Sequence, residues 1–396
     1  MINLPKNRCT ACAACMAVCP VDAIEMKSDG LYGKFPVVDP QKCIHCDACD
    51  RVCPESGLSL RKAEKAYAAV STENDRLVDY ASGGVATEMS KAFIYAGGVV
   101  YGSVLLNSSE VRHMRFDKAQ DVSRACGSKY VFSDISSIFQ PLKSDLKNNL
   151  KVLFIGTPCQ VAAVRSFASK FDQGLFTIDL ICHGVPSGEM LDAYVGPITR
   201  KLNTRPSDTT LNFRWKRPKK NGLDITFGTR MYNLLDGRLI FERRYPRSTY
   251  MAAFFNGISY RENCHNCRYA SIERAGDLTI GDFWGLTDSN LNSSKGVSAI
   301  LVNSDKGSDL VHSFSPDLAL ETHPVTTVTS HNRNLNHPVP RTAEKKNFFE
   351  AVETLGFDRA VKRFVPSFNK ENRISYRIYL ALAKSIYNIR ARLARK

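Results

Sequence analysis

Residues 9–20 read CTACAACMAVCP, and residues 43–54 repeat their cysteine spacing as CIHCDACDRVCP. Each run follows C-x2-C-x2-C-x3-C-P, the bacterial spacing for ligands of 4Fe–4S clusters, in which the fourth cysteine of one run binds the other cluster. Zinc sites usually use separated C-x2-C pairs, and disulfides need an oxidising compartment. We therefore predict two 4Fe–4S clusters, one held by Cys9, Cys12, Cys15 and Cys53, the other by Cys43, Cys46, Cys49 and Cys19.

The length of 396 residues leaves room for two or three domains. We predict an α+β multidomain fold, with a ferredoxin-like domain of two clusters over residues 1–62 and a mixed α/β domain over 63–340. The second domain has an N-terminal part, 63–148, and a C-terminal part, 149–340. A basic, mostly helical tail follows over 341–396. Residues 61–66, RKAEKA, are interpreted as a linker.

The composition indicates the reducing cytosol, because the chain has 13 cysteines, no secretory signal and no apolar run long enough to span a membrane. The net charge of +15 is uneven: residues 201–247 hold 12 Lys and Arg against 4 Asp and Glu, and residues 370–396 hold 8 against 1. Anionic lipid, an acidic substrate or an acidic protein would suit these regions. We do not expect nucleic acid as a partner, because no RNA- or DNA-binding motif accompanies the charge.

The middle of the chain has two strand–loop–helix units, which predict a mostly parallel sheet. A strand at 151–155 leads into Cys159 and a helix, and a strand at 175–181 leads into Cys182 and a second helix. Both cysteines follow carboxyl ends of strands, where open α/β sheets have their ligand crevice. Upstream, Ser82 is predicted to cap a helix that ends before Gly97, with a strand at 99–106 after it.

Five cysteines lie outside the two runs: Cys126, Cys159, Cys182, Cys264 and Cys267. The last four combine two strand ends with one C-x2-C pair, so they form a candidate four-thiolate site. A third 4Fe–4S cluster, zinc and a redox dithiol all fit this pattern. Cys126 is interpreted as a buried, inert thiol. His183 and His265, which flank these cysteines, are expected to form hydrogen bonds or lie at the surface rather than bind metal.

Several ordered motifs give the chain a resemblance to a known family. They are SGGV at 82–85, GSKY at 127–130, GTPCQ at 156–160, Cys182, the Cys264-x2-Cys267 pair and GDFWG at 281–285. In this order they resemble the coenzyme F-420 hydrogenase/dehydrogenase beta-subunit family, in its bacterial form with an N-terminal ferredoxin domain. The resemblance covers residues 1–300.

The resemblance implies FAD bound in the central domain and a third 4Fe–4S cluster on Cys159, Cys182, Cys264 and Cys267. It implies that two segments contact the flavin, and we add two residues of the GTPCQ motif as further cofactor-binding candidates. These candidates are Ser82, Gly83, Gly84, Val85, Gly127, Ser128, Lys129, Tyr130, Thr157 and Gln160. Lys129 is also the candidate catalytic residue, because a cation beside the flavin would stabilise negative charge on its reduced form.

The function that these expectations describe is an iron–sulfur flavoprotein oxidoreductase. It would pass electrons between ferredoxin-type clusters and FAD and reduce or oxidise an organic substrate or the deazaflavin coenzyme F-420. Its partner would be ferredoxin or another redox protein. The alternative is a non-catalytic electron-transfer subunit that docks to a separate redox partner, with the basic region 201–247 as the docking face.

Residues 374–393 predict a basic amphipathic helix, since apolar residues recur on one side and Arg373, Arg377 and Lys384 gather on the other. Such a helix either docks on its own domain or lies on an anionic membrane. We therefore expect a cytoplasmic protein, with peripheral contact at the inner face of the membrane as the second interpretation of the tail.

Overall fold

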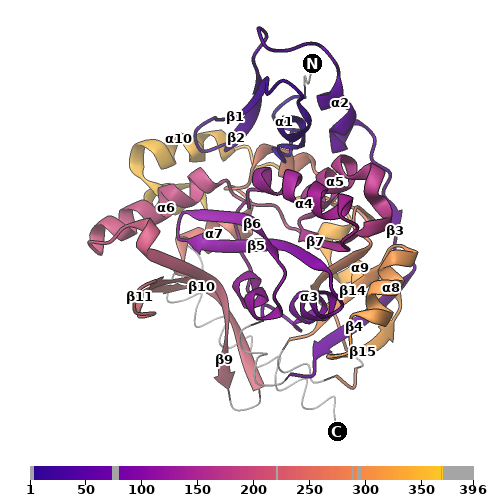
Figure 1. Ribbon diagram of the computed structural model, residues 1–396. Helices are drawn as coiled ribbons and strands as arrows, with labels where there is room; N and C mark the ends of the chain where they lie inside the picture. Colours follow the sequence, from indigo (N-terminus) through magenta and orange to yellow (C-terminus); the bar gives the residue numbers. More distant parts are fainter. Residues whose placement is uncertain are drawn as a thin grey trace.

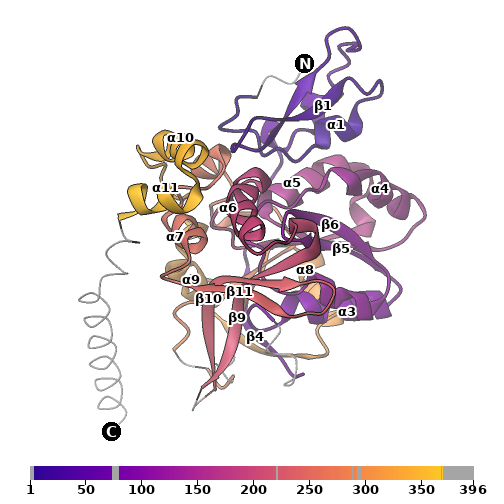
Figure 2. The same cartoon turned by 90° about the vertical axis from the view of Figure 1, so that its left-hand side faces the viewer.

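The computed structural model describes residues 4–73, 80–219, 222–287, 289–291, 296–366 and 368. A small N-terminal domain covers one end of a larger body that is built on an eight-stranded sheet (Figures 1 and 2). In these described ranges, no helix has the length and apolar character needed to cross a membrane. The predicted helix at 374–393 lies outside them.

The N-terminal domain repeats one local structure twice. Its elements are α1 (Ala14–Val18), β1 (Ile24–Ser28), β2 (Lys34–Val38), α2 (Ala48–Val52) and the 3-10 helix η1 (Pro54–Ser56). Ala11 and Ala13 have φ of 51° and 63°, and their counterparts His45 and Asp47 have φ of 52° and 55°. These left-handed residues, rare outside glycine, bend the backbone between the cysteines of each run. The cysteine repeat in the sequence is thus a repeat of backbone conformation.

The central sheet has the order β15-β4-β14-β13-β8-β7-β5-β6. Its strands are β4 (Lys65–Ser71), β5 (Val99–Asn107), β6 (Glu110–Phe116), β7 (Val152–Gly156), β8 (Leu175–Leu180), β13 (Leu278–Asp282), β14 (Ser298–Val302) and β15 (Leu318–His323). Strands β5, β7, β8 and β13 are parallel neighbours, and the other pairs are antiparallel. The prediction of a mostly parallel sheet is therefore wrong outside this centre. The two-residue turn between β5 and β6, for example, can join only antiparallel strands.

The segment 61–66 is not a linker, so that interpretation is wrong. Strand β3 (Arg61–Lys62) pairs with β12 (Glu273–Arg274), and β4 begins three residues later inside the central sheet. Strand β4 lies between β14 and β15, whose residues come more than 200 positions later. The N-terminal domain therefore leads directly into a sheet strand.

Helices cover both faces of the sheet. Adjacent residues of β7 point to opposite faces, as in any strand: Leu153 packs in the core with α3 (Val85–Tyr95) and α8 (Asp305–Ser313), and Phe154 packs with α4 (Phe139–Lys147) and α5 (Pro158–Phe167). The core around Phe154 also includes Cys12 and Cys15 of the N-terminal domain. One hydrophobic core thus extends from the sheet into the domain that carries the cysteine runs.

A second layer lies beside the sheet (Figure 2). It contains the antiparallel ribbon β9 (Thr209–Lys219), β10 (Gly222–Asn233) and β11 (Leu239–Arg244), with α6 (Gly188–Lys201), α7 (Thr249–Asn256), α9 (Val325–His331), α10 (Lys345–Leu355) and α11 (Phe357–Phe364). Phe348 and Phe357 of α10 and α11 are buried against Tyr250 of α7. The described part of the C-terminal region therefore packs on the central domain.

Candidate functional site

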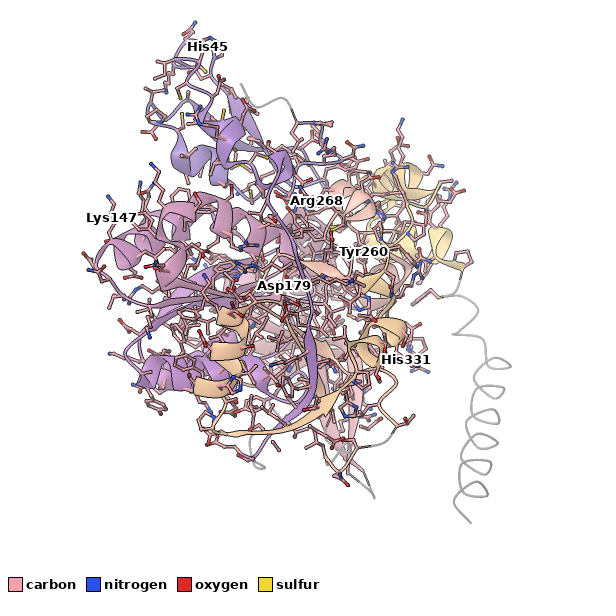
Figure 3. All side chains as sticks on the ribbon, turned by 90° about the vertical axis from the view of Figure 1, so that its right-hand side faces the viewer. His45, Lys147, Asp179, Tyr260, Arg268 and His331 are labelled. Atoms are coloured by element: carbon pink, nitrogen blue, oxygen red, sulfur yellow. The ribbon has the colours of Figure 1, made fainter. Side chains whose placement is uncertain are left out.

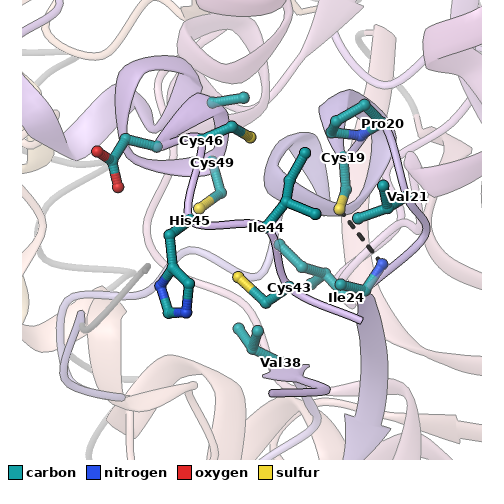
Figure 4. A pocket seen from close by; sticks show the side chains of 13 residues that line it. Cys19, Pro20, Val21, Ile24, Val38, Cys43, Ile44, His45, Cys46 and Cys49 are labelled. Carbon is teal, nitrogen blue, oxygen red and sulfur yellow. Dashed lines mark hydrogen bonds between the residues drawn. The ribbon is translucent and has the colours of Figure 1, made fainter. Parts of the chain in front are cut away.

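Two hollows in the N-terminal domain are each lined by four cysteines. The first has Cys9, Cys12 and Cys15 from the first run and Cys53 from the second, and its space is about 310 Å³, open solvent included. The second hollow, of about 370 Å³, has Cys43, Cys46 and Cys49 with Cys19 (Figure 4). In each hollow, three cysteines thus come from one run and the fourth comes from the other run. Four thiols around one hollow fit the donor set that a 4Fe–4S cluster requires.

The two hollows differ in depth. Cys9, Cys12 and Cys15 of the first are buried, whereas Cys46 of the second is exposed. Beside Cys46, the Ile44 side chain is 60% exposed, and His45 marks the outer tip of the domain (Figure 3). We call them the inner hollow, lined by Cys9, Cys12, Cys15 and Cys53, and the outer hollow, lined by Cys19, Cys43, Cys46 and Cys49.

The thiols of the inner hollow ionise only at high pH when no positive charge is bound among them. Burial raises the pKa of Cys9 and Cys53, and it raises the pKa of Cys12 to about 12. Cluster irons would supply the missing positive charge, because metal binding requires thiolates and releases their protons. In the outer hollow, the Ala23 N–H donates to Cys19 Sγ at 3.3 Å, a contact that stabilises sulfur charge (Figure 4).

The four scattered cysteines come together at the carboxyl end of the parallel strands. Cys159 lies in the first turn of α5, directly after β7, and Cys182 follows β8. Burial raises the pKa of Cys182 well above its usual value, and the Cys264, Cys159 and Cys267 thiols raise it further. Burial also raises the pKa of Cys159 to about 11, with Cys264 adding to it. Mutual effects of this kind place the four thiols within electrostatic reach of one another.

No group of three or more His, Cys, Asp or Glu side chains within the described ranges could hold a metal ion. This finding concerns groups gathered around one ion. A 4Fe–4S cluster instead needs its thiolates at separate corners of a cubane, so the finding does not test a cluster site.

The Ser82–Val85 segment forms a tight backbone crossing at the start of α3. Ser82 Oγ donates to the Val297 carbonyl at 3.0 Å, and Gly83 N donates to Ser298 Oγ at 2.9 Å. The prediction that Ser82 caps the helix is wrong: the cap position belongs to Gly84, with φ of 90°, because the Ser82 hydroxyl bonds to Val297 instead. A Cβ at Gly83 would lie 2.2 Å from the Ala69 carbonyl oxygen, so only glycine fits there.

The Gly127–Tyr130 segment lies beside this crossing, since Thr87 Oγ1 of α3 is 3.3 Å from Cys126 Sγ. Lys129 Nζ donates to the carbonyls of Ala125 and Cys126, at 2.6 and 2.9 Å, and burial lowers its pKa to about 8. The candidate cation thus lies folded back on its own loop. Cys126, interpreted as a buried thiol, is only partly buried.

Thr157 and Gln160 form a capping box at the start of α5. The Thr157 N–H donates to Gln160 Oε1 at 3.0 Å, and Gln160 Nε2 donates to the Ser133 carbonyl at 2.7 Å. Gln160 is buried, and both ends of its amide are bonded within the chain. In this arrangement the pair holds the loop that carries Cys159.

Sequence reasoning missed one charged pair at this end of the sheet. Arg214 of β9 donates two hydrogen bonds to Asp282, which ends β13, at 2.9 and 3.0 Å. Arg214 Nε is buried and has no hydrogen-bond partner within the described part of the chain. Burial raises the pKa of Tyr130 and Arg214 opposes that rise, so the GSKY segment lies within reach of this pair. Asp282 belongs to the GDFWG motif, which is the signal that could have found it.

The histidines beside the scattered cysteines differ in their surroundings. His265 is buried, with Nδ1 3.0 Å from the Val339 carbonyl oxygen and Nε2 2.9 Å from Lys345 Nζ. Burial lowers the pKa of His265 to about 4, and the positive charge of Lys345 lowers it further. Burial also lowers the pKa of His183, with Asp282 opposing this shift.

Two cations of the basic region 201–247 pair with carboxylates from outside the region. Arg243 pairs with Asp358 of α11 at 2.7 Å, and Arg214 pairs with Asp282 at 2.9 Å. These two pairs offset only a small part of the positive charge of the region, so it keeps most of the excess that could attract an acidic partner.

Two family models match this chain. Residues 149–328 match the model of the C-terminal part of the coenzyme F420 hydrogenase/dehydrogenase beta subunit, and residues 8–58 match the 4Fe-4S dicluster domain. The match over residues 149–328 confirms the resemblance to the coenzyme F420 hydrogenase/dehydrogenase beta-subunit family that the sequence motifs indicated. The chain is a mixed α/β protein of the iron–sulfur oxidoreductase type, with an N-terminal ferredoxin-type domain.

Among solved structures, the chain is similar to a chain of the F420-reducing [NiFe] hydrogenase complex from Methanosarcina barkeri. The two share 19% identity over 76% of this chain and 95% of that one, with a TM-score of 0.47. A search of curated proteins finds no match.

Proposed function

We propose that this protein is an iron–sulfur flavoprotein oxidoreductase. It carries electrons between three 4Fe–4S clusters and FAD, for the reduction or oxidation of an organic substrate or of coenzyme F420. The observation that carries the proposal is the order of the thiol sites: an exposed one at the tip, a buried one behind it, and a third at the carboxyl end of the sheet.

The inner hollow and the four scattered thiols share one hydrophobic core. Cys12 and Cys15 from the inner hollow and Cys159 and Cys267 from the third site belong to the same cluster of packed residues. A dry, continuous core between two cluster sites supports electron transfer between them, because it keeps the sites close and excludes water. The exposed Cys46 makes the outer hollow the natural place for an external redox protein to exchange electrons.

FAD would supply the step that clusters lack, since it exchanges one or two electrons and so joins single-electron carriers to an organic substrate. Two features of the chain fit it. Arg214 keeps a buried N–H without a partner in the described residues, and the Ser82–Val85 segment crosses the start of β14 at the same strand ends. Ser82, Gly83, Gly84 and Val85, with Gly127, Ser128 and Tyr130, would hold the flavin. Thr157 and Gln160 would position the adjoining loop.

Lys129 is proposed as the catalytic residue. Among the described residues its ammonium is bonded only to two carbonyls of its own loop, so it can turn toward a negatively charged group beside Gly127. In the protonated form it would stabilise charge on the reduced cofactor. In the neutral form it would not.

Cofactor content tests the proposal directly. Anaerobically purified chain should hold about twelve irons, about twelve sulfides and one FAD, the content of three 4Fe–4S clusters plus flavin. About eight irons without flavin would leave only the N-terminal clusters and contradict it. A Cys159→Ala/Cys182→Ala variant should lose about four irons while the clusters of the N-terminal domain remain.

One observation supports the second candidate function, a non-catalytic electron-transfer subunit. The outer hollow is lined by one exposed apolar residue, Ile44, at 60% exposure. Exposed apolar groups at a redox site suit docking of a protein partner. Turnover of a small molecule by the isolated, fully loaded chain would exclude this alternative.

A further inference from the structure

Arg261 is a buried cation at the junction of the two domains. Arg261 is only 2% exposed. Its Nη1 donates a hydrogen bond of 2.9 Å to the carbonyl of Thr10, which lies between Cys9 and Cys12 in the first cysteine run. Its backbone joins it to the scattered cysteines on the other side, since the Arg261 carbonyl accepts the Cys264 N–H at 3.1 Å. The guanidinium lies 4.4 Å from the centroid of the Phe132 ring. One side chain thus contacts the first cysteine run, and its backbone helps to hold the C-x2-C turn.

Within the described ranges, no carboxylate lies at ion-pair distance from Arg261, and its buried Nη2 has no hydrogen-bond partner. The carboxylate of Glu189 is near but does not pair with it: a Cβ on Gly33 would lie 3.7 Å from Arg261 Nε and 3.8 Å from Glu189 Oε2. A buried charge without a partner is costly, so folded proteins rarely keep one. A further negative group in direct reach of the guanidinium should balance it.

The position of Arg261 identifies that negative group: its Nη1 donates to the carbonyl between Cys9 and Cys12, and its own carbonyl accepts the N–H of Cys264. The positive charge of Arg261 lowers the pKa of Cys9, a ligand candidate of the inner hollow, against the rise caused by burial. It acts in the same direction on Cys159 of the third site. A 4Fe–4S core with four thiolates carries net negative charge in both of its oxidation states. Two such groups, one on each side, would balance the guanidinium.

We propose that Arg261 is a positioning residue that serves as the shared counter-charge of two 4Fe–4S clusters, the one in the inner hollow and the one on Cys159, Cys182, Cys264 and Cys267. The second half of this inference rests on the proposed function, because it needs the third cluster. When one electron passes between these clusters, the donor is oxidised by one electron and the acceptor reduced by one, with no proton required. The cation stabilises the extra negative charge on either side, so it raises both reduction potentials.

The test is a redox titration of the full, anaerobically reconstituted chain, followed by electron paramagnetic resonance of the reduced clusters. Arg261→Gln keeps a hydrogen-bonding amide of smaller size but removes the charge. It should lower the equilibrium constant for reduction of both clusters about tenfold, which is about 59 mV for a one-electron couple. The outer cluster should keep its potential. Unchanged potentials at full iron content would overturn the proposal.

Two further variants separate charge from packing. Arg261→Lys keeps the charge, so its potentials should stay within about threefold of wild type in equilibrium constant, or about 28 mV. If Arg261→Gln fails to assemble its clusters, a tenfold loss in Arg261→Lys would overturn the proposal on its own. The matched control is Arg165→Gln. Arg165 Nη1 also reaches across the junction, to the Ser59 carbonyl at 3.4 Å, but its charge is not among the main causes of the pKa shifts of Cys9 and Cys159.

The iron count distinguishes failure of this inference from failure of the proposed function. Wild-type chain with about eight irons would refute the third cluster, and a shift of the inner potential in Arg261→Gln would still support the role of Arg261 at the inner hollow. If wild-type chain holds about twelve irons and Arg261→Gln leaves the reduction potentials unchanged, the role of Arg261 is refuted while the proposed function stands.

Discussion

The guanidinium of Arg214 and the carboxylate of Asp282 lie fork to fork, joined by hydrogen bonds of 2.9 and 3.0 Å. The Arg214 side chain is 6% exposed and that of Asp282 21%. The pair fastens the β-ribbon of the second layer to the carboxyl end of the central sheet. It therefore fixes one wall of the candidate flavin site.

Asp282→Asn should destabilise the protein strongly, because it leaves a buried guanidinium without a counter-charge. We expect the free energy of unfolding to fall by about 3 kcal/mol, the scale for breaking a buried pair. Chemical denaturation followed by circular dichroism measures it. The matched control is Asp208→Asn, which breaks the exposed pair with Arg205 and should leave stability unchanged. If both substitutions lower the free energy of unfolding equally, the buried Arg214–Asp282 pair contributes no more to stability than the exposed Arg205–Asp208 pair.

Paired cysteine substitutions test the exchange of ligands between the two runs. Cys9→Ala/Cys53→Ala removes two thiols from the inner hollow, so it should cost one cluster, or about four irons. Cys9→Ala/Cys19→Ala removes two thiols from the same run but from different hollows, and should cost both clusters, or about eight irons. Iron and sulfide analysis decides between them. The opposite order would mean that each run binds its own cluster.

Lys129 predicts a pH dependence. Its pKa is lowered to about 8 by burial, so the ammonium is charged below about pH 8 and becomes neutral above it. The flavin potential should therefore fall as the pH rises through about 8, more steeply than proton uptake by the flavin itself requires. Lys129→Ala should abolish that extra slope. Lys129→Arg should also abolish it but keep the higher flavin potential, because the guanidinium stays charged over the whole range. A Lys129→Ala variant with the wild-type profile and full activity would exclude the residue from catalysis.

Gly83→Ala tests the backbone crossing at the start of α3. The added Cβ would lie 2.2 Å from the Ala69 carbonyl oxygen and 2.9 Å from Ser298 N, so backbone must move. We expect a loss of about 2 kcal/mol of stability, in the range for overpacking, together with loss of bound flavin. Gly188→Ala is the matched control, since Gly188 has no atom near the position of an added Cβ. Normal flavin content in Gly83→Ala would contradict the proposed role of this segment.

Ile44→Ser, which adds no charge beside the cluster site, tests the outer hollow as the place where a partner exchanges electrons. The side chain is 60% exposed, so the substitution should leave cluster content and stability nearly unchanged. It should slow reduction by a protein donor, but not reduction by dithionite, which needs no docking surface. Stopped-flow spectroscopy with each donor measures the two rates. An equal effect on both donors would mean that the substitution disturbs the cluster rather than the docking.

Local features of the fold were predictable from the sequence. The cysteine runs and the strands β7 and β8 depend on neighbouring residues, so spacing and hydrophobic pattern were enough to place them. Contacts between distant segments were not predictable. Strand β4 pairs with strands more than 200 residues later in the sequence. The residues RKAEKA at 61–66 contain no local pattern that predicts this pairing. Ser82 was predicted as a helix cap because Val297, which competes for its hydroxyl, lies 215 residues away.

The same distinction holds within the candidate site. Asp282 belongs to the GDFWG motif, which is one of the motifs that carry the family resemblance. Arg214 lies in the region 201–247, for which the sequence indicated only an excess of positive charge. The position of Arg261 at the domain junction could not be predicted for a similar reason, because Thr10, whose carbonyl accepts its hydrogen bond, lies 251 positions away in the sequence. Charged residues acquire their meaning from partners that the fold supplies, and charge counts along the sequence miss those partners.

The passage of the chain from β3 directly into β4 has a consequence for kinetics. Electron-carrying domains on flexible tethers must swing between donor and acceptor, and solvent friction slows their turnover. Here the N-terminal domain is clamped by the β3–β12 pair and continues into an interior strand of the sheet. Passage of an electron out of this domain requires no such swing, so its rate should be insensitive to added glycerol or sucrose.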